Sequence, residues 1–371
     1  MIEDKGFILF LDFYKAFDSV EHPFILKALE YFGFGHKFIK IIDMLYNDIN
    51  SSVSLSWGTS KRFEVKRGIR QGCSCSPLLF ILVAELLAIL IKNSPDIEPL
   101  NVLGKNLSII QLADDSTIFL KSSVQIPLVI KRIEIFSKAS GLHLNLKKCE
   151  LMAIHDHSII DLYEIPVKKE VKYLGVVITK ENKARVDLNI GPSKKKSELI
   201  LRSWLQRDLS LFGRILITKI ESLSRVMYPA FSVAIPDSLI KAINQTNFNF
   251  IWRNKHHYLR KGDSVKPLEE GGLNVIDYEV MNGMIKLKWL KHFLQNINGF
   301  WFHIPFKIFE VCGGIDFLLR CDFCLSKLPI KLSKFHEQVL LYWKMIFKHN
   351  FTPHNSPIWN NRYILVKRKS S

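Results

Sequence analysis

The chain has 371 residues, 48% of them hydrophobic, and a formal net charge of +17. This length and apolar content allow one large domain or two to three ordinary ones, and they exclude a disordered chain. The charge is uneven: residues 1–150 carry 18 basic and 16 acidic side chains, whereas residues 151–371 carry 34 and 19. A near-neutral part followed by a basic part is typical of a protein that binds a polyanion, although a solvated, lysine-rich surface gives the same balance.

The first residues, the longest apolar stretch and the cysteines give no sign of a signal peptide, a membrane span or a zinc site. Acidic residues precede the first apolar run, and no signal-peptide cleavage pattern follows it. The longest apolar stretch, residues 77–91, contains Glu85 and is too short to span a bilayer comfortably. Cys321 and Cys324 form a CxxC pair near Cys312, but no second pair follows, so we expect buried thiols in preference to a zinc site.

The first 100 residues read as a strand, helices and a hairpin. Residues 7–11 form a short continuous apolar run, which predicts a buried strand. Residues 23–46 have helical periodicity interrupted by glycines, which predicts two helices. Residues 51–65 alternate around Gly58 and predict a hairpin. Ser76 is the expected N-cap of a helix over residues 77–92.

The next segment predicts a hairpin, a helix and a further strand. We expect strands at 107–112 and 116–120, a helix at 126–140 closed by Gly141, and a strand at 171–179 containing Gly175. The order of elements predicts an α+β fold, in which helices cover one face of an antiparallel sheet and the other face is free for substrate.

After residue 179 the pattern of apolar and polar residues becomes typical of amphipathic helices. Helices are expected at 197–209, 214–226 and 239–252, and the lysine run 194–196 marks the expected boundary. The last seventy residues are rich in aromatic side chains and weakly patterned.

Three aspartates could share one site. Asp12 follows the first predicted strand, and Asp114 and Asp115 lie at the tip of the predicted hairpin. Clustered carboxylates repel each other unless a cation joins them, and two divalent metals held in this way form a phosphoryl-transfer centre. Two adjacent aspartates are also common in a solvated turn, so this second interpretation stays open.

A glycine-containing loop, RGIRQGCSCSPLLF at residues 67–80, precedes the helix that starts at Ser76. Gly68 and Gly72 allow close backbone approach, and Gln71 can form a hydrogen bond with a ligand. A purely structural turn explains the loop equally well. It is not a P-loop, because the chain contains no GxxxxGK[ST].

The order of these motifs resembles the reverse transcriptases of non-LTR (LINE-type) retrotransposons. Five segments carry the resemblance: LDFYKAFDSV, RGIRQGCSCSPLLF, LADD, GLHLNLKKCEL and KYLGVVIT. The resemblance implies a polymerase palm at residues 1–180, a mostly helical thumb or connection at 181–300 and a C-terminal extension at 301–371. It further implies RNA-directed DNA synthesis from deoxynucleoside triphosphates (dNTPs), with an RNA template, a DNA primer and two Mg²⁺ ions, or Mn²⁺ in their place. It implies a nuclear location, with the cytoplasm as the alternative.

The resemblance also assigns roles to single residues. The implied metal ligands are Asp12, Asp114 and Asp115. Lys148 would protonate the leaving pyrophosphate, although it is otherwise one of two surface lysines. The implied nucleotide contacts are Phe17, which would exclude a 2′-hydroxyl, with Gln71 and Gly72. The implied primer grip is Tyr173, Leu174 and Gly175. Phe17 can also be a core aromatic.

Other features depart from the family pattern. Leu112 replaces the usual aromatic residue before ADD, and Ser74 and Cys75 replace a proline–leucine pair. The chain begins almost at the first motif, and it shows neither the fingers, the endonuclease nor a CCHC knuckle, which suggests a truncated copy or a partial gene. The alternatives are therefore an inactive relic that binds nucleic acid, and an RNA-dependent RNA polymerase, against which Phe17 argues. Arg253, Lys255, Arg260 and Lys261, with Trp252 between them, could bind template and primer, or form a solvated face.

Overall fold

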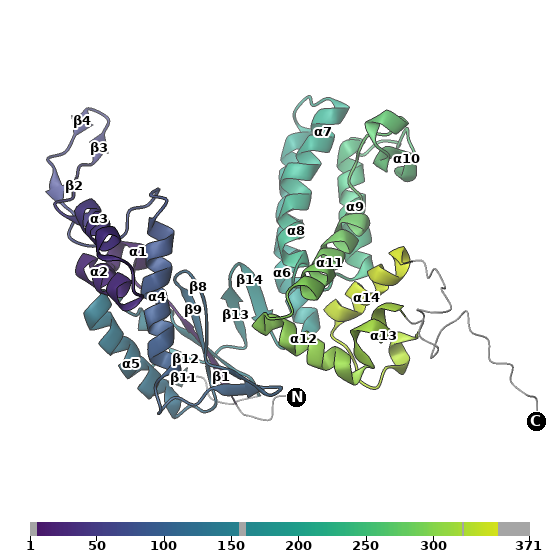
Figure 1. Cartoon of the computed structure of the whole chain (residues 1–371). Helices are drawn as coiled ribbons and strands as arrows, with labels where there is room; N and C mark the ends of the chain where they lie inside the picture. Colours follow the sequence, from purple (N-terminus) through teal and green to yellow (C-terminus); the bar gives the residue numbers. More distant parts are fainter. Residues whose placement is uncertain (1–5, 156–160, 321–322, 348–371) are drawn as a thin grey trace, which may run out of the picture. The chain divides into compact units, whose positions relative to one another are not determined.

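The computed structural model describes residues 6–155, 161–320 and 323–347 (Figure 1). The chain divides into two compact units, Met1–Leu174 and Gly175–Ser371. Each unit is described below by itself.

The centre of the first unit is a four-stranded sheet in the order β10-β1-β9-β8. Its strands are β1 (Phe7–Leu11), β8 (Ile109–Leu112), β9 (Asp115–Leu120) and β10 (Glu150–Ala153). All three pairings are antiparallel. The predicted strand at 7–11 and the predicted hairpin with aspartates at its tip are therefore confirmed.

The two faces of the sheet differ. Side chains alternate along β1, and Leu9 lies opposite both Ile118 and Leu151. These three residues are fully buried in one core cluster with residues of α2, α4 and α5. Ile8 and Phe10 belong to the opposite face. The structure thus confirms the predicted α+β arrangement, with helices packed on one face of an antiparallel sheet.

The helices of this unit follow the predicted pattern with one correction. Two helices, α2 (His22–Tyr31) and α3 (His36–Tyr46), are separated at the predicted glycines. Helix α5 (Gln125–Ser140) ends at Gly141, which has φ +80° and donates its N–H to Ser137 O. Helix α4 (Ser76–Lys92) begins one residue earlier than predicted, so Ser76 is its first residue, its hydroxyl is buried without a partner, and Cys75 holds the N-cap position.

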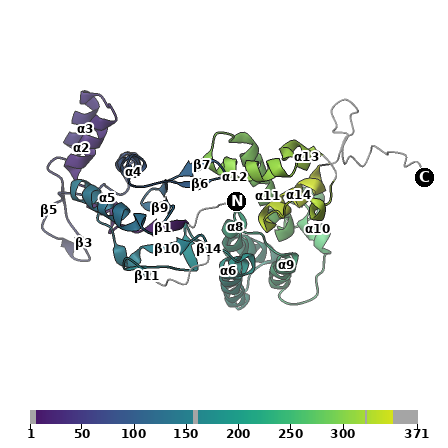
Figure 2. The same cartoon turned by 90° about the horizontal axis from the view of Figure 1, so that it is seen from below.

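A long hairpin lies between α3 and α4. Its base pairs β2 (Asn50–Ser51) with β5 (Phe63–Glu64), and its end pairs β3 (Ser54–Leu55) with β4 (Gly58–Thr59). The predicted hairpin is confirmed, with its turn at Ser56 and Trp57. Figure 1 shows β2, β3 and β4 extending beyond the helices of the unit, and Figure 2 shows β3 and β5 standing clear of α4 and α5 as well.

Short elements complete the first unit. They are α1 (Ala16–Ser19), β6 (Leu100–Val102), β7 (Lys105–Leu107), η1 (Leu146–Lys148), β11 (Asp161–Leu162), β12 (Ile165–Pro166) and β13 (Glu170–Tyr173). The single strand predicted at 171–179 is wrong: Leu174 (φ +48°) and Gly175 (φ +77°) break it into β13 and β14 (Val176–Thr179). Two consecutive left-handed residues cannot continue an extended strand.

The second unit is helical after β14. Its elements up to residue 295 are α6 (Asn182–Leu205), α7 (Leu211–Ile217), η2 (Thr218–Leu223), α8 (Ser224–Ala230), α9 (Asp237–Ile251), α10 (Lys261–Val265), η3 (Leu268–Glu270) and α11 (Tyr278–Gln295). The predicted helices at 197–209 and 239–252 correspond to α6 and α9, but α6 starts 15 residues before the predicted start at 197. The predicted single helix at 214–226 is divided into α7, the π-helix η2 and α8. The lysine run 194–196 lies inside α6 and marks no linker.

The remaining described elements pack on α11. They are α12 (Phe300–Val311), α13 (Gly314–Arg320), η4 (Leu325–Lys327) and α14 (Lys334–Ile346). Phe293 and Phe309 are fully buried in a largely aromatic cluster between them. Cys312 is buried as expected, Cys324 is exposed, and Cys321 lies outside the described residues. In the described parts of the chain we find no helix that is both long and apolar enough to cross a bilayer.

Candidate active site

The sheet register brings Asp12 beside Asp115. Strand β1 pairs with β9 so that Phe10 faces Thr117 and Leu11 faces Ser116. The next position along this register sets Asp12 against Asp115. Because side chains alternate across a pleated sheet, both aspartates belong to the face of Phe10 and Thr117, the face opposite the helices.

Asp114 lies in the two-residue turn between β8 and β9, where Leu112 pairs with Asp115. The turn also contains Ala113, whose φ of +53° lies in the left-handed region that such tight hairpin turns require. Asp114 and Asp115 are exposed, and Asp12 is half-buried. The structure therefore brings all three predicted aspartates to one edge of the sheet.

The electrostatics of Asp115 accord with Asp12 and Asp114 lying near it. Partial removal from water, followed by repulsion from Asp114 and then from Asp12, raises the pKa of Asp115 above its usual value. As the side chains stand, no group of three or more Asp, Glu, His or Cys residues within the described ranges is close enough to hold an ion. The donor set nevertheless suits a divalent cation, because it consists of carboxylate oxygens whose mutual repulsion a cation would relieve.

Asn145 is a residue of this site that the sequence did not reveal. Its side-chain Nδ2 donates to Oδ2 of Asp12 at 2.9 Å, and its backbone N–H donates to Asp12 O at 2.8 Å. The side chain is only 3% exposed. Asn145 lies within GLHLNLKKCEL, but only the tertiary structure shows that this segment runs beside Asp12, where Leu144 bridges to Phe13.

Phe17 is fixed by packing. Its ring stacks on that of Phe80 in α4, with ring centroids 4.2 Å apart, and its side chain is half-buried at the edge of the core. Its carbonyl oxygen accepts the backbone N–H of Ile69 at 2.6 Å. Phe17 is thus a packed aromatic at the border of the core, an arrangement that holds its ring in one orientation.

The glycine-containing loop lies directly against the segment after Asp12. Gly68 N–H donates to Val20 O at 2.7 Å, and a ring nitrogen of His22 lies 2.9 Å from Gly68 O. A Cβ at Gly68 would lie 2.8 Å from Asp18 O, and φ there is +93°, so only glycine allows this approach. Gln71 and Gly72 follow and are exposed.

A cleft of about 610 Å³ lies beside this loop. Its polar lining includes Asp18, Asn50, Arg67, Arg70 and Gln71. The predicted nucleotide contact Gln71 therefore lines a basic cleft that continues into the base of the β2–β5 hairpin. Gly72 has open space around its α-carbon.

The remaining predicted residues lie at two other places. Lys148 is exposed at the end of η1, and its backbone N–H donates to Asn145 O at 2.9 Å. Tyr173 packs its ring against Phe10, with ring centroids 5.4 Å apart, and so lies over the same sheet face as Asp12. Leu174 and Gly175 form the turn that follows.

The basic segment of the second unit differs from expectation in one respect. Trp252 is 7% exposed and packs in a small core with Phe248 and Ile251, so it cannot stack on a nucleic-acid base. Arg253 pairs with Asp208 at 2.6 Å, and Lys261 pairs with Asp277 at 2.5 Å. These pairs reduce the positive charge available to a ligand.

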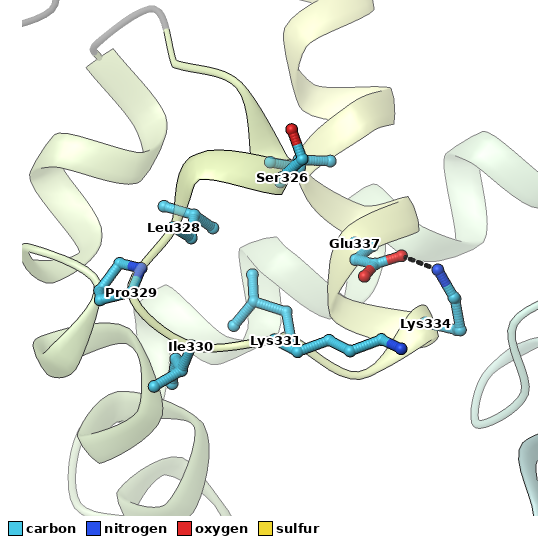
Figure 3. Close-up of a pocket in the computed structure, with 9 residues that line it drawn as sticks. Ser326, Leu328, Pro329, Ile330, Lys331, Lys334 and Glu337 are labelled. Atoms are coloured by element: carbon cyan, nitrogen blue, oxygen red, sulfur yellow. Dashed lines mark hydrogen bonds and ion pairs between the residues drawn. The ribbon is translucent and has the colours of Figure 1, made fainter.

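A separate cavity of about 480 Å³ lies in the second unit and contains none of the predicted site residues (Figure 3). It is lined by the segment 325–334 and by Glu337, whose carboxylate pairs with Lys334 at 2.6 Å. Its walls combine aliphatic side chains with Ser326, Lys331, Lys334 and Glu337.

Comparison with known proteins agrees with the geometry. Residues 3–178 match the family model for reverse transcriptase (RNA-dependent DNA polymerase). The chain is 24% identical over 294 residues to the transposon TX1 uncharacterized 149 kDa protein of Xenopus laevis, a match that covers 77% of the chain and 22% of that protein. It is 27% identical over 207 residues to the retrovirus-related Pol polyprotein from the type-2 retrotransposable element R2DM of Drosophila melanogaster, covering 51% and 19%.

Among solved structures, telomerase from Candida tropicalis in complex with a TWJ fragment of telomeric RNA aligns with a TM-score of 0.40 and 13% identity, over 77% of this chain and 47% of that one. The chain spans about a fifth of the length of the two transposon proteins it matches. Residues 3–178 are a reverse transcriptase domain, and the two relatives named above are proteins of a transposon and of a retrotransposable element.

Proposed function

We propose that this chain catalyses RNA-directed DNA synthesis, adding deoxynucleotides to the 3′-hydroxyl of a DNA primer on an RNA template. The observation that carries the proposal is the position of Asp12 beside Asp115 on the open face of a sheet, with Asp114 in the adjoining turn. A protein that only binds nucleic acid has no need of three converging carboxylates, because they repel phosphates.

Each residue of the site has a distinct task in this proposal. Asp12, Asp114 and Asp115 would hold two Mg²⁺ ions, whose charge stabilises the attacking and the leaving oxygen. Asn145 holds Oδ2 of Asp12 in one orientation. Lys148, exposed on η1, would donate a proton to the leaving pyrophosphate.

Selection of the nucleotide would depend on the loop and on Phe17. Gln71 lines the basic cleft and is free of the core, so it can form a hydrogen bond with an incoming dNTP. The Phe17 ring, held by Phe80, would overlap a 2′-hydroxyl and so favour deoxynucleotides. Tyr173, Leu174 and Gly175 would hold the primer end, because Tyr173 already lies over the sheet face that carries Asp12.

The second unit would bind the duplex product. We propose that residues 181–300 act as a thumb through their excess of basic side chains. Residues 301–371 would be a C-terminal extension, and α12, α13 and α14 of this extension pack on α11. A nuclear location accords with this function, since the target of such an element is chromosomal DNA.

Primer extension tests the proposal. The purified chain is incubated with a labelled DNA primer on an RNA template, dNTPs and Mg²⁺. We expect extension by the wild type and none by Asp114→Asn, which keeps the side-chain shape and removes the charge. Asp43→Asn, at an exposed position of α3, is the matched control and should extend normally.

Three results would contradict the proposal. Extension by Asp114→Asn at the wild-type rate would remove the carboxylates from the mechanism. Salt-sensitive binding of the template–primer without any extension by the wild type would favour the relic. Equal incorporation of ribonucleotides and deoxynucleotides would instead indicate an RNA polymerase.

A further inference from the structure

The hairpin of residues 50–66, here named the basic arm, has a charge unlike that of the unit that carries it. Residues 50–70 contain five basic side chains, Lys61, Arg62, Lys66, Arg67 and Arg70, and one acidic side chain, Glu64. Their net charge is +4, whereas the rest of residues 1–150 carries 13 basic and 15 acidic residues, a net of −2. All five basic residues are exposed, so the positive charge of this unit is concentrated on the arm and its base.

The tip of the arm presents an unpacked aromatic ring. Trp57 is 85% exposed, the highest value among the large hydrophobic side chains described as exposed. It lies in the tight turn between β3 and β4, and Gly58 after it has φ +145°. Phe63, on the return strand, is 49% exposed. Burial of an indole of this size would stabilise the fold, whereas its exposure at the tip of a cationic hairpin leaves the ring available to a ligand with a flat apolar face.

The arm leads to the cleft beside the glycine-containing loop. Asn50 and Ser51 at its base line the same cleft as Arg67, Arg70 and Gln71. Arg62 Nη1 donates to Asn50 Oδ1 at 3.0 Å, which ties the two strands together at the base. A ligand lying along the arm would therefore pass directly into the cleft that contains Gln71.

We infer that the basic arm binds single-stranded nucleic acid, with a base stacked on Trp57 and phosphates contacted by Lys61 and Arg62. The combination of a cationic ribbon and an exposed aromatic ring fits a single strand because only unpaired bases expose a face for stacking. A duplex offers phosphates but no free base face. The identity of this strand as the unpaired template ahead of the reaction rests on the function proposed above. The binding of a single strand by the arm does not depend on that function.

Fluorescence polarisation with a labelled single-stranded RNA tests the inference, without dNTPs. Trp57→Ala should weaken binding roughly 5-fold to 150-fold, the range that loss of one base–aromatic stack produces. Trp57→Phe should restore most of the affinity. Lys61→Ala/Arg62→Ala should lower the slope of log affinity against log salt concentration by about 1.4, since each phosphate contact with a single strand contributes about 0.7.

Matched controls separate the arm from general effects. Tyr31→Ala removes an aromatic ring that is 62% exposed on α2, and Lys105→Ala/Lys131→Ala removes two exposed charges outside the arm. Tyr31→Ala should not lower the affinity for single-stranded RNA as Trp57→Ala does. Lys105→Ala/Lys131→Ala should not lower the slope of log affinity against log salt concentration as Lys61→Ala/Arg62→Ala does. Binding of a blunt DNA duplex should be unaffected by Trp57→Ala. A single-stranded DNA of the same sequence shows whether the arm distinguishes the two sugars.

The inference is overturned if Trp57→Ala binds single-stranded RNA as tightly as the wild type, or loses affinity for single strand and duplex equally. Thermal denaturation of each variant excludes unfolding, which is not expected at a residue with so little packing. If the wild type extends a primer and Trp57→Ala binds single-stranded RNA as the wild type does, the inference about the arm is refuted and the catalytic function stands. Binding that depends on Trp57 in a chain without extension refutes the catalytic function alone.

Discussion

Asn145 donates its side-chain amide to Oδ2 of Asp12 at 2.9 Å, across 133 residues of sequence. Both the side chain and the backbone N–H of Asn145 bind Asp12, and Asn145 is almost fully buried. A buried amide that donates to a carboxylate restricts the rotation of that carboxylate. The contact therefore decides which oxygen of Asp12 remains available to another ligand.

We predict that Asn145→Ala slows primer extension without weakening nucleotide binding. Hydrogen bonds to charged groups contribute about 1.5–3 kcal/mol, so kcat should fall at least about tenfold. The KM for dNTP should stay constant, and the Mg²⁺ concentration for half-maximal rate should rise. Asn101→Ala, an exposed asparagine bonded to Asn106, is the control. An unchanged Mg²⁺ dependence would show that Asn145 does not position the metal ligand.

Much of this site follows from local sequence patterns. The apolar run before Asp12 and the two runs around Asp114 and Asp115 predict strands, and the short connection predicts a tight hairpin. The polarity of the exposed and buried positions then selects the register, because a one-residue slip would turn Leu9 away from the core. The approach of Asp12 to the distant pair Asp114 and Asp115 can thus be predicted from sequence alone.

Other features depend on tertiary packing and were missed. The residues next to Trp252 in the sequence are compatible with an exposed ring as well as with a ring packed against Phe248. Its burial therefore cannot be predicted from the local sequence. The lysine run 194–196 has the polarity of a linker but lies within the 24-residue helix α6. The partner of Asn145 lies more than a hundred residues away, and no periodicity records that contact.

Asp115 should make stability depend on pH and on divalent metal. Its pKa is raised in the folded protein, so the folded state retains a proton that the unfolded chain has lost. The free energy of unfolding contributed by this group therefore falls as pH rises from about 3.8 through the raised pKa. Without divalent ions at neutral pH, Asp115→Asn should be more stable than the wild type, and this advantage should disappear in acid.

Magnesium should reverse that order. A ligand that binds only the folded state at a hundredfold excess over its Kd stabilises it by about 2.7 kcal/mol. Mg²⁺ should therefore raise the Tm of the wild type and leave the Tm of Asp115→Asn nearly unchanged. Thermal denaturation with and without Mg²⁺ measures both values. Asp43→Asn should respond as the wild type does. Equal responses of wild type and Asp115→Asn would exclude this residue as a metal ligand.

Phe17 should control the choice between sugars. Phe17→Val shortens a side chain held against Phe80 and opens the space that a 2′-hydroxyl would need. We expect the ratio of kcat/KM for dNTP to that for the matching ribonucleotide to fall at least tenfold, chiefly because the ribonucleotide is used better. Phe13→Val, at a half-buried aromatic position of the same segment, should leave the ratio constant. Equal losses for both nucleotides would indicate a packing role alone.

Lys286 should make the stability of the second unit increase with pH. The side chain is fully buried, its Nζ donates to Val233 O at 2.8 Å and to Ala230 O, and it lies 4.5 Å from the centre of the Phe335 ring. Burial lowers its pKa from 10.5 to about 7. Between pH 7 and 10.5 the unfolded chain therefore binds a proton that the folded chain does not, so the free energy of unfolding rises with pH across this window.

Lys286→Met tests this prediction, because methionine has a similar volume and does not titrate. The difference in unfolding free energy, wild type minus variant, should grow by up to about 1.4 kcal/mol per pH unit within the window, measured by denaturant titration at several pH values. Loss of the two carbonyl hydrogen bonds adds an offset that is independent of pH. Lys288→Met, at an exposed position of the same helix, should give curves parallel to the wild type. Parallel curves for Lys286→Met as well would mean that the buried amine keeps its ordinary charge, held by the carbonyls of Ala230 and Val233.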